Sequence, residues 1–212
     1  MSHYNPANPV TDIGQIRDFY RDAYAAQELK ILNHIDPLCA AWIAKSTFLV
    51  MSTHDANGRV DASPKGDPAG FVHVLDDTTL AIPDRPGNHR FDSFANILDT
   101  GQIGLVFLVP NRNEVVRVNG TAQIVRDIDI RTPLAINGRI PEFAIIVDVK
   151  EAFYHCGKAI IRSQLWAPAK FPKPANLPTY AEAILAHSNV DHSLADMTAH
   201  LKDNDENRLY DE

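Results

Sequence analysis

The spacing of hydrophobic positions in this chain is helical at first, then strand-like, then helical again. In residues 1–45 apolar side chains recur every three or four positions, as they do on one face of a helix. Asp36 followed by Pro37 fits a helix N-cap with proline at the first helical position. We therefore expect this part to be helical, with Trp42 and Ile43 packed on the body of the protein.

The middle of the chain has the pattern of β-strands, in short apolar runs separated by turn signals such as Asn57-Gly58. Six strands are expected, at residues 47–53, 71–75, 79–82, 102–109, 114–125 and 143–149. One short helix is expected over residues 91–98. Its inward face is expected to carry Phe91, Phe94, Ile97 and Leu98. Parallel strands need crossover connections of about a dozen residues or more, usually helical, and these do not recur between the runs. The pattern therefore predicts a mainly β fold with flanking helices, arranged as an antiparallel barrel.

Three regions follow from this pattern. Residues 1–45 are expected to form a helical segment packed on the barrel, and residues 46–166 the barrel domain itself. Residues 167–212 are expected to form a Pro-rich link and a polar helical tail. The chain has 212 residues and no internal repeat, so one substantial domain with its own core is expected.

Composition and charge exclude several classes of protein. The net charge is −7 and the pI about 5.7, which argues against binding nucleic acid through a general basic field. No apolar run approaches the roughly 18 residues of a membrane span, and the first residues lack the pattern of a signal peptide. Cys39 and Cys156 could pair, but two reduced thiols fit better. We expect a cytoplasmic protein with no nucleic-acid or membrane partner.

Familiar catalytic motifs are missing. The chain contains no GxSxG, GxxxxGK[ST], GxGxxG or HExxH sequence, so hydrolase, P-loop, dinucleotide and zincin sites have no local support. Its nine histidines are scattered without ligand spacing, and no metal site is expected. No side chain is an obvious general acid or base, and the catalytic residues stay unassigned.

Two segments combine cations with small residues, as a phosphate site does. Residues 63–66 and residues 84–90 are each expected to be a loop after a strand-like run. Lys65 offers a compact ammonium, and Arg85 and Arg90 offer planar forks of N–H donors. Aspartates lie near both segments, so the alternative is two solvated turns whose charges pair with each other.

A second group of cations lies in a stretch without acidic residues, between Glu151 and Glu182. Lys158, Arg162 and Trp166 there are about one helical turn apart and can face one side, where they would suit a flat anionic ligand. The alternative is that Trp166 anchors the tail while the two cations lie in solvent. Separately, an arginine occurs within the apolar run 115–118; this residue, Arg117, faces either solvent or a ligand.

Several segments together resemble the FMN-binding split-barrel family related to pyridoxamine 5′-phosphate oxidase. They are VDASPKG (60–66), TLAIPDRPGNHRFDSFANIL (79–98), IGLVFLV (103–109), VVRVNGTAQIV (115–125) and CGKAIIRSQLW (156–166). The resemblance covers residues 45–166 and rests on the order and spacing of the segments. It implies a six-stranded antiparallel split β-barrel that binds FMN at the interface of a homodimer.

The resemblance also implies which residues contact FMN. They are Asp61, Ala62, Ser63, Pro64, Lys65, Gly66, Ile82, Pro83, Asp84, Arg85, Asn88, Arg90, Asn96, Arg117, Lys158, Arg162, Ser163 and Trp166. The last four would approach from the second subunit. Lys65 or Arg117 would stabilise the anionic reduced flavin near its N1–C2 edge.

The chain departs from the pyridoxamine 5′-phosphate oxidases themselves. Their phosphate strand begins with arginine, whereas this chain has DASPK, and its tail lacks their terminal arginine pattern. We therefore expect an FMN-dependent oxidoreductase that acts on a small organic substrate or a nicotinamide-type donor. The alternatives are a pyridoxamine 5′-phosphate oxidase, or a non-catalytic split barrel that binds flavin or heme.

Overall fold

The computed structural model describes residues 4–20, 22–171 and 175–211, and its contacts divide the chain into two compact units. The first unit, Met1–Ile31, contains two helices of five residues each, α1 (Ile13–Arg17) and α2 (Ala25–Leu29). No side chain of either helix is buried. The helical character expected for this segment is present in two short pieces, and its packing on the barrel stays a prediction.

The second unit, Leu32–Glu212, begins with the helix α3 (Pro37–Ile43). Asp36 is its N-cap, because its carboxylate accepts a hydrogen bond from the Cys39 N–H at 2.8 Å. Trp42 and Ile43 are buried in the core, as the sequence predicts. Burying each of these side chains contributes roughly 1.5–3 kcal/mol, so α3 is an integral part of the domain.

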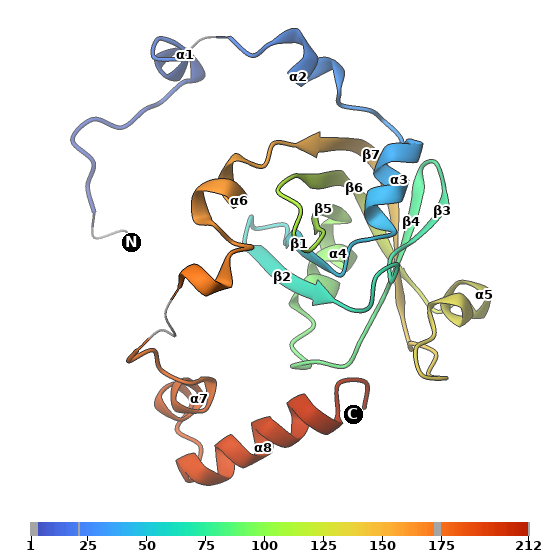
Figure 1. Ribbon diagram of the computed structural model, residues 1–212, viewed down its shortest axis with the longest axis vertical. Helices are drawn as coiled ribbons and strands as arrows, with labels where there is room; N and C mark the ends of the chain where they lie inside the picture. Colours follow the sequence, from blue (N-terminus) through green and yellow to red (C-terminus); the bar gives the residue numbers. More distant parts are fainter. Residues whose placement is uncertain (1–3, 21, 172–174, 212) are drawn as a thin grey trace. The chain divides into compact units, whose positions relative to one another are not determined.

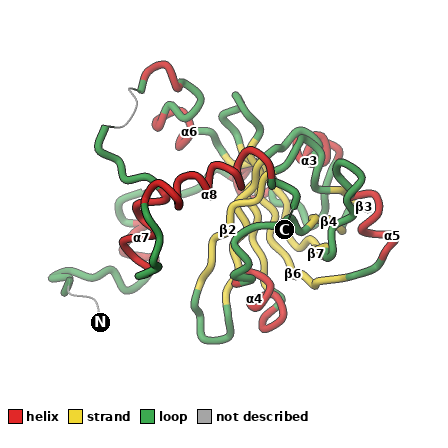
Figure 2. The backbone as a smooth tube through the Cα atoms, turned by 90° about the horizontal axis from the view of Figure 1, so that it is seen from below, coloured by secondary structure: helices red, strands yellow, loops and turns green. Residues whose placement is uncertain are grey.

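A single antiparallel sheet forms the body of this unit, with the strand order β2-β1-β5-β6-β7-β4-β3 (Figure 1). Its strands lie side by side in Figure 2. The strands are β1 (Phe48–His54), β2 (Val60–Gly66), β3 (His73–Asp76), β4 (Thr79–Pro83), β5 (Gln102–Leu108), β6 (Val115–Val125) and β7 (Ala144–His155). The mainly β, antiparallel prediction is confirmed.

The sheet has seven strands where the sequence predicts six, and β2 is the additional one. Its residues were expected to end in a loop from position 63 onwards, but they continue the ladder with β1, in which Ser63 faces Met51 and Pro64 faces Val50. A proline is tolerated there because β2 is an edge strand, where a missing N–H donor need not break a second ladder. The segment 60–66 therefore forms a wall rather than a turn.

Most of the core lies on one face of the sheet, and a smaller buried cluster of Ala81, Leu134 and Ala144 lies on the other. Alternate residues of the central strands are fully buried, among them Met51 of β1, Leu105 of β5 and Val118 of β6. The strands β6 and β7 are bulged between Asn119 and Gly120, where a side chain at Gly120 would collide with the backbone of β7.

The helices of this unit flank the sheet and complete the chain. After α3 they are α4 (Asp92–Thr100), α5 (Ile128–Arg131), η1 (Thr132–Leu134), α6 (Lys158–Ser163), η2 (Pro168–Lys170), α7 (Tyr180–Ser188) and α8 (Leu194–Asn207). Cys39 and Cys156 are both free, and burial raises the pKa of the Cys39 thiol to about 12. Within the described part of the chain, the helices are too short or too polar to cross a bilayer.

Candidate functional site

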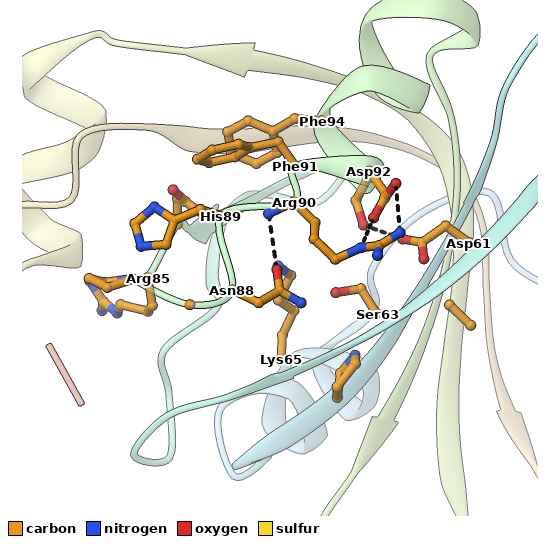
Figure 3. Close-up of a pocket in the computed structure, with 16 residues that line it drawn as sticks. Asp61, Ser63, Lys65, Arg85, Asn88, His89, Arg90, Phe91, Asp92 and Phe94 are labelled. Carbon is orange, nitrogen blue, oxygen red and sulfur yellow. Dashed lines mark hydrogen bonds and ion pairs between the residues drawn. The ribbon is translucent and has the colours of Figure 1, made fainter. Parts of the chain in front are cut away.

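A cavity of about 350 Å³ lies between strand β2 and the segment that joins β4 to α4 (Figure 3). One wall consists of residues 61–65 of β2, and the other consists of residues 84–94. Both segments were singled out in the sequence for their cations, and the fold brings them together. The volume lies within the range of about 300–1,000 Å³ that is usual for small-molecule sites.

The β2 wall presents its polar side chains in alternation. Asp61, Ser63 and Lys65 are half-buried, whereas Ala62 and Pro64 between them are exposed, because successive side chains of a strand point to opposite faces. Ser63 faces the buried Met51 across the ladder, so these three polar residues lie on the core side of the sheet.

The facing wall has an unusual backbone. His89 and Phe91 have φ values of 54° and 55°, in the left-handed region that residues other than glycine adopt infrequently. The Asn88 side chain supports this conformation by accepting a hydrogen bond from the Arg90 N–H at 3.1 Å. Such conformations persist only where the surrounding structure imposes them, and they concentrate at functional sites.

Aromatic rings stabilise this wall from one end of the cavity. The ring of Phe91 lies 6.1 Å from that of His89 and 5.9 Å from that of Phe94, which in turn meets Phe143 at 5.9 Å. These distances are those of attractive aromatic pairs. The cavity therefore has an apolar end beside its charged one.

The charged end contains Arg90 and two carboxylates. Arg90 Nε donates to Asp92 Oδ2 at 2.7 Å, and Figure 3 shows the guanidinium between Asp92 and Asp61. The hydrogen bond between Arg90 and Asp92 raises the pKa of the guanidinium and lowers the pKa of the carboxyl. Asp61 accepts a second hydrogen bond, from Ser93 Oγ at 2.7 Å. The prediction that nearby aspartates pair with the cations is correct for Arg90.

Lys65 and Arg85 differ in whether their charged groups already have partners in the protein. Arg85 Nε donates to Asp67 Oδ2 at 2.6 Å, and its NH2 group donates to the Leu134 carbonyl at 2.9 Å. Its guanidinium is thus fixed in the wall. No carboxylate of the described residues forms an ion pair with Lys65, whose ammonium is available to an anion.

The remaining residues predicted to contact the cofactor do not line this cavity. Ile82 and Pro83 are buried in β4, and Gly66 ends β2. The Asn96 amide points into the core, where it donates to Thr53 Oγ1 at 3.0 Å.

Arg117 lies on the other face of the sheet from Lys65. Its neighbours Val116 and Val118 are fully buried, and its guanidinium lies 5.0 Å from the ring of Phe153. Contact with a cofactor by Arg117 stays a prediction.

The cations of α6 are also away from the cavity of their own chain. Lys158, Arg162 and Ser163 are exposed, and Trp166 donates its Nε1–H to the Arg112 carbonyl at 2.6 Å. Trp166 therefore anchors the segment that follows α6, which agrees with the alternative weighed from the sequence. The cofactor roles of these four residues stay predictions.

Sequence reasoning missed the aromatic lining. Phe91 and Leu98 were expected to point inward, yet they are 53% and 77% exposed. Ile97 is buried as expected, and the other two buried residues of α4 are the polar Ser93 and Asn96. The left-handed backbone of Phe91 at the N-cap of α4 leaves no signal in the hydrophobic spacing.

The fold is a split barrel, and its cavity has cations on both walls. A family model described as pyridoxamine 5′-phosphate oxidase matches residues 35–156, which is more than half of the chain. The chain therefore belongs to the pyridoxamine 5′-phosphate oxidase family. A comparison with curated proteins gave no match.

Several solved structures resemble part of the chain at low identity. HupZ of Group A Streptococcus is 22% identical with a TM-score of 0.48, over 57% of this chain and 93% of that one. A putative pyridoxamine 5′-phosphate oxidase of Lactobacillus delbrueckii is 23% identical with a TM-score of 0.46, over 57% and 95%. HutZ, the heme storage protein of Vibrio cholerae, is 12% identical with a TM-score of 0.42, over 57% and 94%.

Proposed function

We propose that the chain is an FMN-binding flavoprotein that transfers hydride or electrons between FMN and a small organic substrate or a nicotinamide-type donor. The observation that supports this most is the position of Lys65 and Arg90 on facing walls of one cavity. A cofactor with a phosphate at one end and a flat ring system at the other matches a cavity with one charged and one aromatic end.

The donor set fits a phosphate. A phosphate monoester carries a charge of about −1.5 to −2 at neutral pH, and it is bound by guanidinium forks, ammonium groups and hydroxyls. Arg90 and Ser63 supply a guanidinium fork and a hydroxyl for the phosphate, and Lys65 supplies an ammonium on the facing wall, towards the ring of the cofactor. The first turn of α4 adds backbone N–H groups at the same end.

Arg90 must exchange partners when the anion binds. In the ligand-free chain it is held by Asp92, an exposed ion pair of the kind that contributes little stability in water. A dianion that accepts two hydrogen bonds from the guanidinium competes well with this single carboxylate.

The bound flavin supplies the redox chemistry, and the residues of this chain bind it, orient it and tune it. Lys65 would hold a positive charge near the ring, which favours the anionic reduced form. Phe91 and Phe94 would shield one part of the site from water. Hydride transfer to or from the flavin has no obligatory protein base, which suits a lining whose titratable acids are aspartates and whose one imidazole is His89.

A homodimer completes the proposal. The cations of α6 do not line the cavity of their own chain, so a second copy is the route by which Lys158 and Arg162 would reach the cofactor. The resemblance to FMN-binding split barrels implies a homodimer, and this supports the arrangement.

Heme binding is the second candidate, and one observation favours it. His89 lines the cavity in a constrained backbone conformation, and histidine is a common axial ligand of heme iron. Titration with hemin, read by its visible spectrum in the wild type and in His89→Ala, separates this candidate from the flavin proposal.

The main test compares FMN with riboflavin, which lacks the phosphate. We expect fluorescence titration to show FMN binding much more tightly than riboflavin. Arg90→Ala should weaken FMN binding roughly tenfold or more, because a charge-assisted fork is lost. Binding of riboflavin should hardly change.

Arg17→Ala is the matched control. Arg17 is 65% exposed and pairs with Asp22, whereas Arg90 is 64% exposed and pairs with Asp92, so the two substitutions remove similar surface ion pairs. Equal FMN affinities of the two variants would contradict the phosphate assignment. Bleaching of the bound flavin with NADH and with NADPH then identifies the electron donor.

A further inference from the structure

A carboxylate next to the cavity connects two distant parts of the chain. Asp67 follows β2, and its side chain is only 1% exposed. Its Oδ2 accepts from Arg85 Nε at 2.6 Å, and its Oδ1 accepts from the Tyr210 hydroxyl at 2.6 Å. The two donors lie 18 and 143 residues from Asp67 in the sequence, so the contact with Tyr210 ties the end of the described chain to the cavity wall.

Arg85 belongs to two cavities at once. It lines the cofactor cavity, and it also lines a second cavity of about 180 Å³ on the other side of residues 84–86. Tyr210 and Arg139 are part of the lining of that second cavity. Tyr210 therefore lies on the side of the segment 84–86 that faces away from the cofactor cavity.

The part of the tail that follows α8 is held by polar contacts at this point. The helix α8 (Leu194–Asn207) has no buried residue, so apolar burial does little to hold it. Beyond α8, Arg139 NH1 donates to the Tyr210 carbonyl at 2.8 Å and forms an ion pair with Asp211. A segment held by a few polar contacts at its end opens at low free-energy cost.

Removing the Tyr210 hydroxyl would leave a buried carboxylate with half of its donors. A buried charge that loses a partner is costly, and the surrounding structure rearranges to hydrate it. The segment 84–91 would respond first, because Arg85 shares the same carboxylate and because the left-handed residues of the segment depend on the surrounding contacts to keep their conformation.

We propose that Tyr210 is a positioning residue for the cofactor cavity, and that attachment of the tail through Asp67 regulates how tightly the cavity holds its ligand. With the tail attached, Asp67 fixes Arg85 and the wall 84–91 stands in its binding geometry. With the tail released, the wall loosens and the ligand dissociates faster. The choice of FMN as the ligand rests on the proposed function, whereas the link from Tyr210 through Asp67 to the wall 84–91 does not.

The experiment compares Tyr210→Phe with Tyr180→Phe. Both substitutions remove one hydroxyl from the same tail, but Tyr180 is 68% exposed at the start of α7. Amide hydrogen exchange is measured on the ligand-free proteins, and FMN affinity is then titrated in the same preparations. In Tyr210→Phe we expect faster exchange in residues 84–91 and 208–211 only, and FMN affinity lower by roughly 3- to 10-fold. In Tyr180→Phe we expect neither change.

Each other outcome counts against the proposal. Unchanged exchange in residues 84–91 refutes the link, whether or not the tail is released. Faster exchange throughout β5 and β6 means general destabilisation and also refutes it. Faster exchange in the wall with unchanged FMN affinity refutes the regulatory role.

Failure of the proposed function would look different. If the wild type binds no FMN, the cofactor assignment fails, while exchange in residues 84–91 still decides whether Tyr210 positions the wall. If Tyr210→Phe does not fold, Arg139→Gln releases the tail at its other contact and leaves Asp67 intact. The same two segments should then respond, and no response would refute the link.

Discussion

At the scale of single residues, the site contains three cations, two of which are paired with carboxylates. Lys65 has no ion-pair partner among the described residues, Arg85 is held by Asp67, and Arg90 is held by Asp92. Asp92 Oδ1 also lies 3.6 Å from the NH2 group of Arg59, so this carboxylate pairs with both Arg59 and Arg90. It is therefore the residue that most opposes an incoming anion.

Replacing Asp92 by asparagine should strengthen FMN binding by a few-fold. The change removes the carboxylate that Arg90 must leave before it can bind phosphate, and the side chain keeps nearly the same shape. Isothermal titration at low and high salt measures the effect, which should shrink as salt screens the charges.

The control for this change is Asp22→Asn, which removes the carboxylate of the exposed Arg17 pair. It should leave FMN binding unaltered. A weaker affinity in Asp92→Asn than in the wild type would show that Asp92 supports the site instead of competing with the ligand.

The sequence singles out Lys65 and Arg90 because each lies in a short segment of small residues next to a strand-like run, and contact of either with a cofactor stays a prediction. The pairing of Arg85 with a nearby aspartate was weighed from the sequence as the alternative, but the contact of that aspartate, Asp67, with Tyr210 could not be predicted, because the two residues are 143 positions apart. Likewise, the left-handed backbone at Phe91 determines which aromatic rings meet the cavity, and hydrophobic spacing carries no information about it.

At the scale of elements, the strands were predicted best where the apolar run is long and buried. Residues 102–109 and 114–125 correspond closely to β5 and β6. The strand β2 was predicted as a loop from residue 63, because serine, proline and glycine are turn residues in a local view. Its pairing with β1 overrides that preference.

The N-cap of α3 gives a prediction at this scale. Asp36→Ala should lower the free energy of unfolding by about 1 kcal/mol, because the first-turn N–H of Cys39 loses its acceptor. This hydrogen bond lowers the pKa of Asp36 below its ordinary value of 3.8. The stabilisation is thus complete above that pH and disappears as the pH falls through the lowered pKa. Urea unfolding of both proteins at pH 7 and at pH 3 measures the difference.

Asp12→Ala is the matched control for α3. Asp12 caps α1 in the same way, through the Gln15 N–H at 3.2 Å, but no residue of α1 is buried. Its loss should not change the unfolding of the barrel. A similar effect of both substitutions would mean that capping alone, without the buried face of α3, accounts for the result.

At the scale of the whole molecule, the family match covers residues 35–156 and omits both ends of the chain. The barrel and its cavity lie within the match, whereas the first unit and the tail beyond α6 lie outside it. Tyr210 lies outside the match, and through Asp67 it is linked to Arg85 of the cavity wall.

We expect the purified protein to be yellow and to have twice the mass of the 23.5 kDa chain. Light scattering coupled to size-exclusion chromatography gives the mass, and visible absorbance of the same peak gives the flavin content. The physical reason is that Lys158 and Arg162 lie outside the cavity of their own chain and need a second copy to reach a cofactor. A colourless protein whose melting temperature does not change with FMN would contradict the flavin assignment, and a monomer that binds FMN fully would contradict the dimer.

The position of β2 at the edge of the sheet has a consequence for how this protein avoids self-association into fibrils. An edge strand presents unpaired main-chain groups on which another strand can assemble, and this is the usual start of ordered aggregation. Pro64 interrupts that row because it has no N–H, and Asp61 and Lys65 add charges of both signs nearby. We therefore expect substitutions of Pro64 that restore an N–H on this edge to lower the solubility of the protein.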